Sequence, residues 1–333
     1  MRKLTASLAA RLLTALAVAG LLAVAGCSAG TSGGATTHTS SSATGAPETP
    51  YDIRPLLMPS RKYIGATVEG VPQSLTPVTD FSSKVGKSPN LLAYYLAWGD
   101  QFVVDQARSV WNNGQLPYVA WEPFKRSLAQ IADGVDDQYI KQFAASVRTF
   151  HVPVAISFAH EMNGHWYPWG TKSATAADFV RAWRHIHDVF QDASATNVIW
   201  VWSPNVINPA PKVALQPYYP GDGYVDWIGV VGYYTRSGPH TFDTLFGPTF
   251  NQVRTFTHRP FLIAETAAEP GARKPIDIAD LWRGVAARDD VIGFIWFDIQ
   301  KETDWRVASA PDALSAFRRG AADGRFGFDV RQP

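Results

Sequence analysis

Cysteine is nearly absent from this 333-residue sequence, which contains only Cys27. A single cysteine excludes a small secreted scaffold held together by disulfides. The sequence also has no large excess of positive or negative charge. Three of the 30 basic residues, Arg2, Lys3 and Arg11, lie in a leader-like N-terminus, so the remainder carries 27 basic against 29 acidic residues. This balance argues against a nucleic-acid partner.

Motifs of two common hydrolase classes are missing as well. From Tyr51 onward no serine lies in a Gly-x-Ser-x-Gly elbow, which argues against an acyl or peptide hydrolase; Ser157 and Ser203 lie in strand-like contexts without it. His160 and His165 are five residues apart, whereas a zinc-binding HExxH helix needs a spacing of four. The sequence therefore predicts neither a metal site nor a cofactor.

The N-terminal segment predicts export and lipidation. Its basic residues flank an apolar stretch from Leu12 to Ala25, which is too short for a comfortable membrane span and runs into Val-Ala-Gly-Cys. This ending resembles a bacterial lipobox, which implies cleavage before Cys27 and attachment of lipid to it. An ordinary secretory leader with an incidental cysteine is the alternative. We expect residues 1–26 to be a lipoprotein signal peptide and the protein to face the extracellular side of the cell membrane.

Residues 27–50 are rich in serine, threonine, glycine and alanine, with almost no bulky apolar side chain. Such a composition cannot build a core and is typical of a flexible linker. No internal repeat or second linker follows. We therefore expect one globular domain over residues 51–333, monomeric and tethered to the membrane through the lipid on Cys27.

Strand-like and helix-like segments alternate through this domain. Eight apolar runs are typical of buried parallel strands: Tyr63–Val68, Leu91–Leu96, Leu116–Trp121, Val154–Ala159, Val198–Trp202, Trp227–Tyr233, Pro260–Ala264 and Ile292–Phe297. Amphipathic segments indicate helices at Gln101–Trp111, Asp137–Phe150, Ala176–Phe190, Leu245–Thr257, Ile276–Ala287 and Pro311–Ala322. Eight alternating units predict a single-domain α/β fold, the (β/α)8 or TIM barrel.

Two glutamates end strands on opposite sides of the predicted barrel mouth. Glu161 follows the fourth strand and Glu265 ends the seventh. A carboxylate at the end of a buried strand must be solvated, paired or used in chemistry. Either glutamate alone would most simply be a solvated loop charge. Two of them facing each other at the end of the barrel that holds active sites predict hydrolysis of a glycosidic bond.

The neighbourhood of Glu161 adds hydrogen-bonding groups and flat aromatic faces within about ten residues. These are His160, Asn163, His165, Trp166, Tyr167 and Trp169. Solvated loops seldom contain so much tryptophan. At other strand ends, we expect Glu122 and Asn205 to bond sugar hydroxyls and Trp296 to offer a flat face to a sugar ring. Sugar stacking and simple packing remain alternatives for the other tryptophans near the rim, Trp98, Trp202 and Trp305.

Three segments together resemble glycoside hydrolase family 26, a family of retaining endo-acting β-glycanases on (β/α)8 barrels. They are HEMNGHWYPWG at residues 160–170, IAET at 263–266 and IWFDIQKETDWR at 295–306. The resemblance extends over most of the domain. It implies that Glu161 is the general acid/base and Glu265 the nucleophile.

The resemblance also implies roles for the residues around these glutamates. His160 corresponds to the histidine before the acid, Trp166 to the aromatic that shapes the sugar site, Trp296 to a platform tryptophan, and Tyr233 to a tyrosine bonded to the nucleophile. The whole substrate-binding set that we expect is His160, Asn163, Trp166, Trp169, Asn205, Tyr233, Trp296 and Glu122.

The retaining reaction requires the two glutamates to differ in charge. Glu265 should be ionised, and Glu161 should be protonated within reach of the leaving oxygen. Proximity of the carboxyl groups raises one pKa, and we expect an aromatic wall of Trp166 and Trp169 to favour the uncharged form of Glu161.

The substrate is predicted from the same motifs. Family membership favours β-1,4-mannan, and His160, Trp166 and Asn205 are the group expected to read the sugar's 2-hydroxyl. Tyr167-Pro168 and the stretch from Lys301 to Arg306 instead resemble the branch that cuts mixed-linkage β-1,3-1,4-glucan. An inactive, tethered carbohydrate-binding protein is the alternative from another class.

Overall fold

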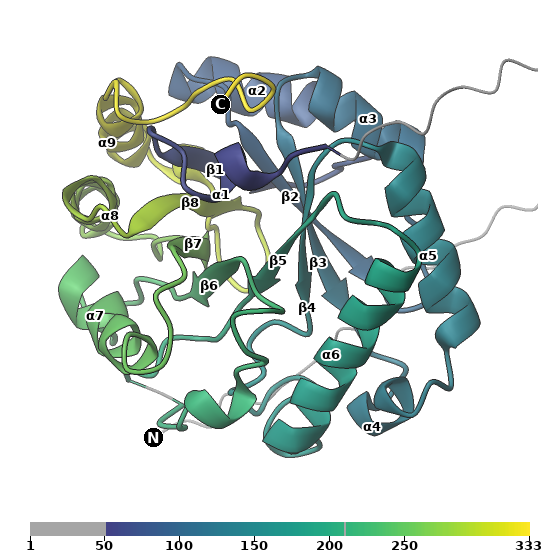
Figure 1. Cartoon of the computed structure of the whole chain (residues 1–333). Coiled ribbons are helices and arrows are strands. Elements are labelled where there is room, and N and C mark those ends of the chain that lie inside the picture. Colours follow the sequence, from purple (N-terminus) through teal and green to yellow (C-terminus); the bar gives the residue numbers. More distant parts are fainter. Residues whose placement is uncertain (1–50, 210) are drawn as a thin grey trace, which may run out of the picture. The chain divides into compact units, whose positions relative to one another are not determined.

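The computed structural model describes residues 51–209 and 211–333, so the predicted signal peptide and linker lie outside the described residues. Eight parallel strands close into a barrel in which neighbours in sequence pair and β8 pairs with β1 (Figure 1). The strands are β1 (Tyr63–Val68), β2 (Leu91–Ala97), β3 (Leu116–Glu122), β4 (Val154–Phe158), β5 (Val198–Trp202), β6 (Trp227–Val231), β7 (Phe261–Thr266) and β8 (Val291–Asp298). The predicted (β/α)8 barrel is confirmed.

Helices surround the barrel on its outside (Figure 1). The α-helices of the described residues are α1 (Arg54–Leu57), α2 (Thr76–Val85), α3 (Val104–Asn112), α4 (Leu128–Ala132), α5 (Asp137–Phe150), α6 (Ala176–Asp192), α7 (Phe242–Val253), α8 (Lys274–Ala287) and α9 (Pro311–Ala321). The prediction missed α2, whose serines and threonines are weak helix formers, although a proline in its first turn and the left-handed Gly86 at its end mark its bounds.

The connection between β5 and β6 departs from the predicted alternation. Its described residues contain no α-helix and form only a 3₁₀ turn, Gln216–Tyr218. The side chain of Trp202, at the end of β5, donates its indole N–H to the carbonyl of Tyr218 at 3.0 Å, so this turn packs against the outside of the barrel. A short turn thus takes the place that a helix occupies after the other strands.

Tryptophans of the strands pack outward against the helices, whereas hydroxyl-bearing side chains, including those of Tyr95 and Tyr118, face inward. Trp121 of β3 stacks on Phe143 of α5 with ring centroids 4.3 Å apart. Inside the barrel, Ser157 Oγ donates to Ser203 Oγ at 2.7 Å. A cavity of about 10 Å³ next to these hydroxyls is also lined by Glu265. It offers room for about one water molecule. The inner face therefore becomes polar toward the end where the strands finish.

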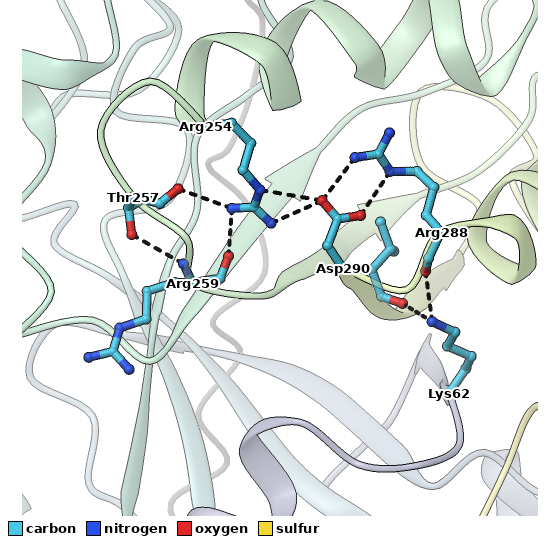
Figure 2. A network of polar contacts seen from close by, with 7 residues as sticks. Lys62, Arg254, Thr257, Arg259, Arg288 and Asp290 are labelled. Atoms are coloured by element: carbon cyan, nitrogen blue, oxygen red, sulfur yellow. Dashed lines mark hydrogen bonds and ion pairs between the residues drawn. The ribbon is translucent and has the colours of Figure 1, made fainter.

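A network of charges closes the opposite end of the barrel, where β1 and β8 begin. Figure 2 shows Asp290, immediately before β8, between the guanidinium groups of Arg254 and Arg288, with N–O distances of 3.1 and 2.9 Å. The ammonium of Lys62, immediately before β1, donates to the carbonyls of Arg288 at 2.8 Å and Val291 at 2.6 Å. The network joins the loops before β8 and β1 to the end of α7, far along the sequence.

Replacing Asp290 with asparagine is expected to destabilise the fold without touching the chemistry. Both guanidinium groups would lose their charged partner, at a cost of about 1–2 kcal/mol in the free energy of unfolding because the site is only partly buried. Thermal unfolding measures the change. Asp52→Asn is the control, since its ion pair with Arg54 is largely exposed and should contribute little. Equal melting temperatures for the two variants would contradict this role.

Candidate active site

The backbone that carries Glu161 is strained. After β4 ends, Ala159 and Glu161 adopt φ values of 48° and 55°, in the left-handed region that residues other than glycine avoid. The N–H of Glu161 donates to the carbonyl of Ser203 at 2.7 Å, and the N–H of Gly164 donates to the carbonyl of Glu161 at 2.8 Å. Strain of this kind persists at functional sites when surrounding contacts fix it. The contacts here aim the glutamate at the barrel mouth.

Two donors hold the carboxyl group of Glu161. Asn205 donates its side-chain N–H to Oε1 at 2.5 Å, and the indole N–H of Trp166 donates to Oε2 at 2.6 Å. Asn205 is itself fixed by Asn163, which accepts the Asn205 N–H at 2.8 Å and donates to its carbonyl at 2.9 Å. Asn163 is fully buried, so the structure contradicts its predicted contact with substrate. Its role here is to orient Asn205.

Burial raises the pKa of Glu161 to about 7, and the nearby Glu265 carboxylate adds to the rise. The hydrogen bonds from Trp166 and Asn205 act in the opposite direction, because they favour the charged form. Burial therefore favours the uncharged form of Glu161, the direction we expected, whereas the indole N–H of Trp166 opposes it. Trp169 does not contact the carboxyl group in the way we expected, since its indole N–H donates to the carbonyl of His160 at 2.7 Å.

Glu265 lies near the end of β7, where the pairing with β6 and β8 is irregular. Successive residues of a regular strand face opposite ways, but Ala264 and Glu265 both line the small cavity inside the barrel. Tyr233 and Tyr95 donate short hydrogen bonds to Oε1 and Oε2 of Glu265, respectively. Burial raises the pKa of Glu265, and these two bonds partly offset the rise.

Tyr95 is a site residue that was not predicted from the sequence. It stands near the end of β2 and faces the barrel interior together with Ala93. Trp98 was the residue expected at this strand end. Alternation inward from Ala93 would have selected Tyr95. With Tyr233, it gives each oxygen of Glu265 a hydroxyl donor and favours the ionised carboxylate that a nucleophile needs.

His160 and Glu122 form a second polar group beside Glu161. The Nε2 atom of His160 lies 3.2 Å from the hydroxyl of Tyr167 and 3.9 Å from Oε1 of Glu122. Burial and the charge of Lys301 lower the pKa of His160 to about 4, so the ring is neutral at pH 7. Burial, together with Glu265 and Glu161, raises the pKa of Glu122 to about 8. Glu122 is thus mostly protonated at pH 7 and can donate to, as well as accept from, a sugar hydroxyl.

The predicted aromatic surfaces differ in their access to substrate. Trp166 is 40% exposed beside Glu161, as a sugar-binding aromatic should be. Trp169 is buried beneath Tyr167, with ring centroids 4.4 Å apart and an angle of 9° between the planes. Tyr167, not Trp169, therefore borders the site on this side.

The structure contradicts the predicted platform role of Trp296. This side chain is 0% exposed and packs its ring against Phe317 of α9, with centroids 5.4 Å apart. Trp305 lies instead beside the site: it is 9% exposed, and its ring centroid is 4.9 Å from that of Tyr233. The indole of Trp305 thus lies next to Tyr233, one of the two tyrosines that hold Glu265.

The other two open cases, Trp98 and Trp202, are packing residues. Trp98 stacks on Trp121 at 4.7 Å and donates its indole N–H to Asp136 at 2.9 Å. Trp202 is fully buried.

Within residues 51–209 and 211–333, no group of three or more His, Cys, Asp or Glu side chains is placed to hold a metal ion. None of the helices described is long and apolar enough to cross a membrane.

A (β/α)8 barrel in which the carboxyl groups of Glu161 and Glu265 lie at the C-terminal ends of β4 and β7, each held by two donors, defines the class: this is a glycoside hydrolase fold and site. The family follows from the sequence comparison. Residues 92–318 match the model of glycosyl hydrolase family 26, and the chain belongs to that family.

Curated relatives agree with this assignment. Endoglucanase H of Acetivibrio thermocellus is 32% identical over 275 residues, which is 78% of this chain and 30% of that protein. Mannan endo-1,4-beta-mannosidase A and B of Caldalkalibacillus mannanilyticus is 30% identical over 149 residues, 43% of this chain and 25% of that protein. The chain therefore spans less than a third of the length of these relatives.

The fold comparison includes the catalytic domain of an endo-beta-1,4-mannanase from Bacillus sp. JAMB-750. Its structure superposes with a TM-score of 0.64 at 14% identity, and the match covers 82% of this chain and 89% of that one. At this identity the likeness establishes the barrel fold.

Replacing Trp166 with phenylalanine is expected to move the alkaline limb of the pH profile of kcat/KM upward. The indole N–H favours ionised Glu161, so its loss raises the pKa of Glu161 by up to about one unit, and the protonated acid persists to higher pH. Profiles of wild type, Trp166→Phe and the remote control Trp111→Phe test this. An alkaline limb that stays in place, or moves down, would show that this bond does not tune Glu161.

Proposed function

We propose that this protein is a retaining, endo-acting β-glycanase that hydrolyses a β-1,4-linked polysaccharide by double displacement. One observation carries the proposal. The carboxyl groups of Glu161 and Glu265 share the barrel mouth, and each is held by two donors on its own oxygens. The roles of nucleophile and acid/base require two carboxyl groups in different environments, and here each group has its own hydrogen-bond donors.

In the first step, ionised Glu265 attacks the anomeric carbon of the bound sugar. A bond forms between this carbon and a carboxylate oxygen as the bond to the leaving glycan oxygen breaks, and Glu161 gives its proton to that oxygen. The pKa of Glu161, about 7, suits this proton transfer near neutral pH. The tyrosines on Glu265 fix its orientation toward the sugar.

In the second step, Glu161 acts as a base. It takes a proton from a water molecule, the water oxygen attacks the anomeric carbon, and the ester bond to Glu265 breaks. Both carboxyl groups return to their starting charges. Neutral His160 and protonated Glu122 lie beside Glu161, where they can exchange hydrogen bonds with sugar hydroxyls without adding charge.

β-1,4-Mannan is the proposed substrate. Mannan endo-1,4-beta-mannosidases recur among the curated relatives, including those of Caldalkalibacillus mannanilyticus and Bacillus subtilis. His160, Trp166 and Asn205 gather around Glu161, where they can read the axial 2-hydroxyl of mannose.

Mixed-linkage β-1,3-1,4-glucan is the second candidate, and a specific observation favours it. Endoglucanase H, whose name indicates a glucan substrate, matches this chain over 275 residues, whereas the mannosidase of Caldalkalibacillus mannanilyticus matches it over 149. The protonated Glu122 beside His160 could bond an equatorial 2-hydroxyl as readily as an axial one.

The test compares kcat/KM on mannohexaose and on a mixed-linkage glucan oligosaccharide of similar length. A preference for the mannan oligosaccharide supports the first candidate, and a preference for the glucan beyond about tenfold, or about 1.4 kcal/mol, replaces it with the second. Binding without hydrolysis of either, or of any related β-glycan, would reject the enzymatic proposal in favour of a carbohydrate-binding protein.

We further propose that the protein is a monomeric lipoprotein of the outer face of the cell membrane. The sequence Val-Ala-Gly-Cys and the linker after it support this location. Cys27→Ser is expected to shift the protein from the membrane fraction to an unprocessed or released form, since a lipid chain is its anchor. Fractionation followed by immunoblotting measures the shift. Normal cleavage with unchanged membrane association would exclude the lipid anchor.

A further inference from the structure

A buried lysine fastens the loop that borders the active site after β8. Lys274, the first residue of α8, is 1% exposed. Its ammonium donates to the carbonyls of Asp304 at 3.0 Å and Arg306 at 2.8 Å, and to Oγ of Ser309 at 2.8 Å. A buried ammonium is costly unless all three N–H groups find acceptors. All three acceptors come from this one loop.

The loop carries Trp305 between the two carbonyls that Lys274 binds. The N–H of Trp305 donates to the carbonyl of Ile299 at 3.1 Å, which closes the loop on itself. Two residues on, the N–H of Val307 donates to Asp298 at 2.6 Å. Bonds from both sides thus fix the backbone at Trp305.

From Trp305 the contacts lead directly to the nucleophile. The indole ring lies 4.9 Å from the ring of Tyr233, whose hydroxyl donates to Glu265. The same loop also carries Lys301, whose positive charge lowers the pKa values of Glu161 and Glu265. A shift of the loop would therefore alter both the aromatic wall and the local charge.

We propose that Lys274 is a positioning residue for catalysis: by fastening residues 304–309 it holds Trp305 against Tyr233 and keeps a sugar-binding face beside Glu265. The inference rests on the proposed glycanase function. Lys274 itself contacts neither of the two glutamates through any described bond. It acts through the loop.

The alternative is that Lys274 only stabilises the fold, and the chain offers a matched control for it. Lys62 also donates from a lysine ammonium to backbone carbonyls, those of Arg288 and Val291, but at the other end of the barrel (Figure 2). Lys274→Met and Lys62→Met each remove such donors while keeping an unbranched side chain. Both should lower the melting temperature.

Only Lys274→Met is expected to change catalysis. On whichever oligosaccharide the wild type cleaves, kcat/KM should fall about ten- to a hundredfold, mainly through a higher KM, because the sugar platform is misplaced. Lys62→Met should stay within about twofold of wild type. Equal kinetics for both variants at a temperature where both are folded would overturn the proposal.

Trypsin provides a readout that does not depend on activity. Lys301 and Arg306 are cleavage sites within the loop, and Lys274 precedes a proline, so its replacement removes no site. Native Lys274→Met should be cut after residues 301 or 306 while wild type and Lys62→Met resist, as mass spectrometry of the fragments would show. Resistance of Lys274→Met would refute the anchoring. If the wild type hydrolyses no glycan, the proposed function is refuted, but the trypsin result still tests whether Lys274 anchors the loop.

A milder variant covers the case in which Lys274→Met does not fold. Ser309→Ala removes one of the three acceptors and keeps the ammonium in place. We expect a smaller rise in KM and faster trypsin cleavage in the same loop. Wild-type values for both measurements would reject the role of this contact and, with it, the proposal.

Discussion

Replacing Glu265 with alanine is expected to lower kcat by about four orders of magnitude or more while the barrel remains folded. Without this carboxylate no group can form the covalent bond to the sugar, and the two tyrosine hydroxyls that now bond to it would face an empty space. Steady-state rates on the best oligosaccharide, with circular dichroism to verify folding, measure the effect.

Glu269→Ala is the matched control for this variant. Glu269 lies four residues further along the chain, in the loop after β7, and pairs with Arg236 rather than with either catalytic glutamate. Its replacement should leave kcat within about twofold of wild type. Near-normal turnover by folded Glu265→Ala would eliminate Glu265 as the nucleophile.

Replacing Glu161 with alanine is expected to separate the two steps of the reaction. Substrates with very good leaving groups need little protonation, so they should still form the glycosyl-enzyme, but its hydrolysis should slow by about a hundredfold or more without a base. A rapid burst of leaving group followed by a slow steady state would reveal the trapped intermediate. Polysaccharide, whose leaving oxygen needs the proton, should be cleaved far more slowly.

Azide provides the discriminating measurement for Glu161. A small anion can occupy the space left by the carboxyl group and attack the intermediate directly, giving a glycosyl azide of retained configuration. Glu69→Ala, which removes an exposed glutamate after β1, should show neither the burst nor the azide product. If azide yields no such product with Glu161→Ala, the acid/base role belongs to another residue.

The barrel could be predicted because its strands are apolar throughout. Parallel strands covered by helices on one face and packed inside the barrel on the other leave an unambiguous signal in each run. The 3₁₀ turn Gln216–Tyr218 in place of a helix could not be anticipated, because it depends on contacts such as the Trp202 bond to the Tyr218 carbonyl. The apolar pattern of a strand can be read from its own residues, whereas the element that covers the strand depends on packing with distant residues.

The site could be predicted to the level of strand ends but not of side-chain directions. Neighbouring residues of a strand face opposite sides, so an error of one residue selects the wrong side chain. Trp296 faces away from the site and is fully buried, whereas the ring of the next residue, Phe297, packs against that of Tyr233. The irregular pairing of β7 at Glu265 changes which side of the strand its residues face, and strict alternation along a strand does not predict this change. Trp305 stands in a loop, so only the fold could bring it to the site.

The stereochemistry of the first product tests the central claim most directly. If Glu265 is the nucleophile and Glu161 the acid/base, the carboxyl groups should be about 5–5.5 Å apart, as in retaining enzymes, and two displacements should preserve the anomeric configuration. Proton NMR of a reaction followed from its first minutes distinguishes the anomers before they equilibrate. We predict that the β anomer forms first; an initial excess of the α anomer would show single displacement by water and contradict the roles assigned to both glutamates.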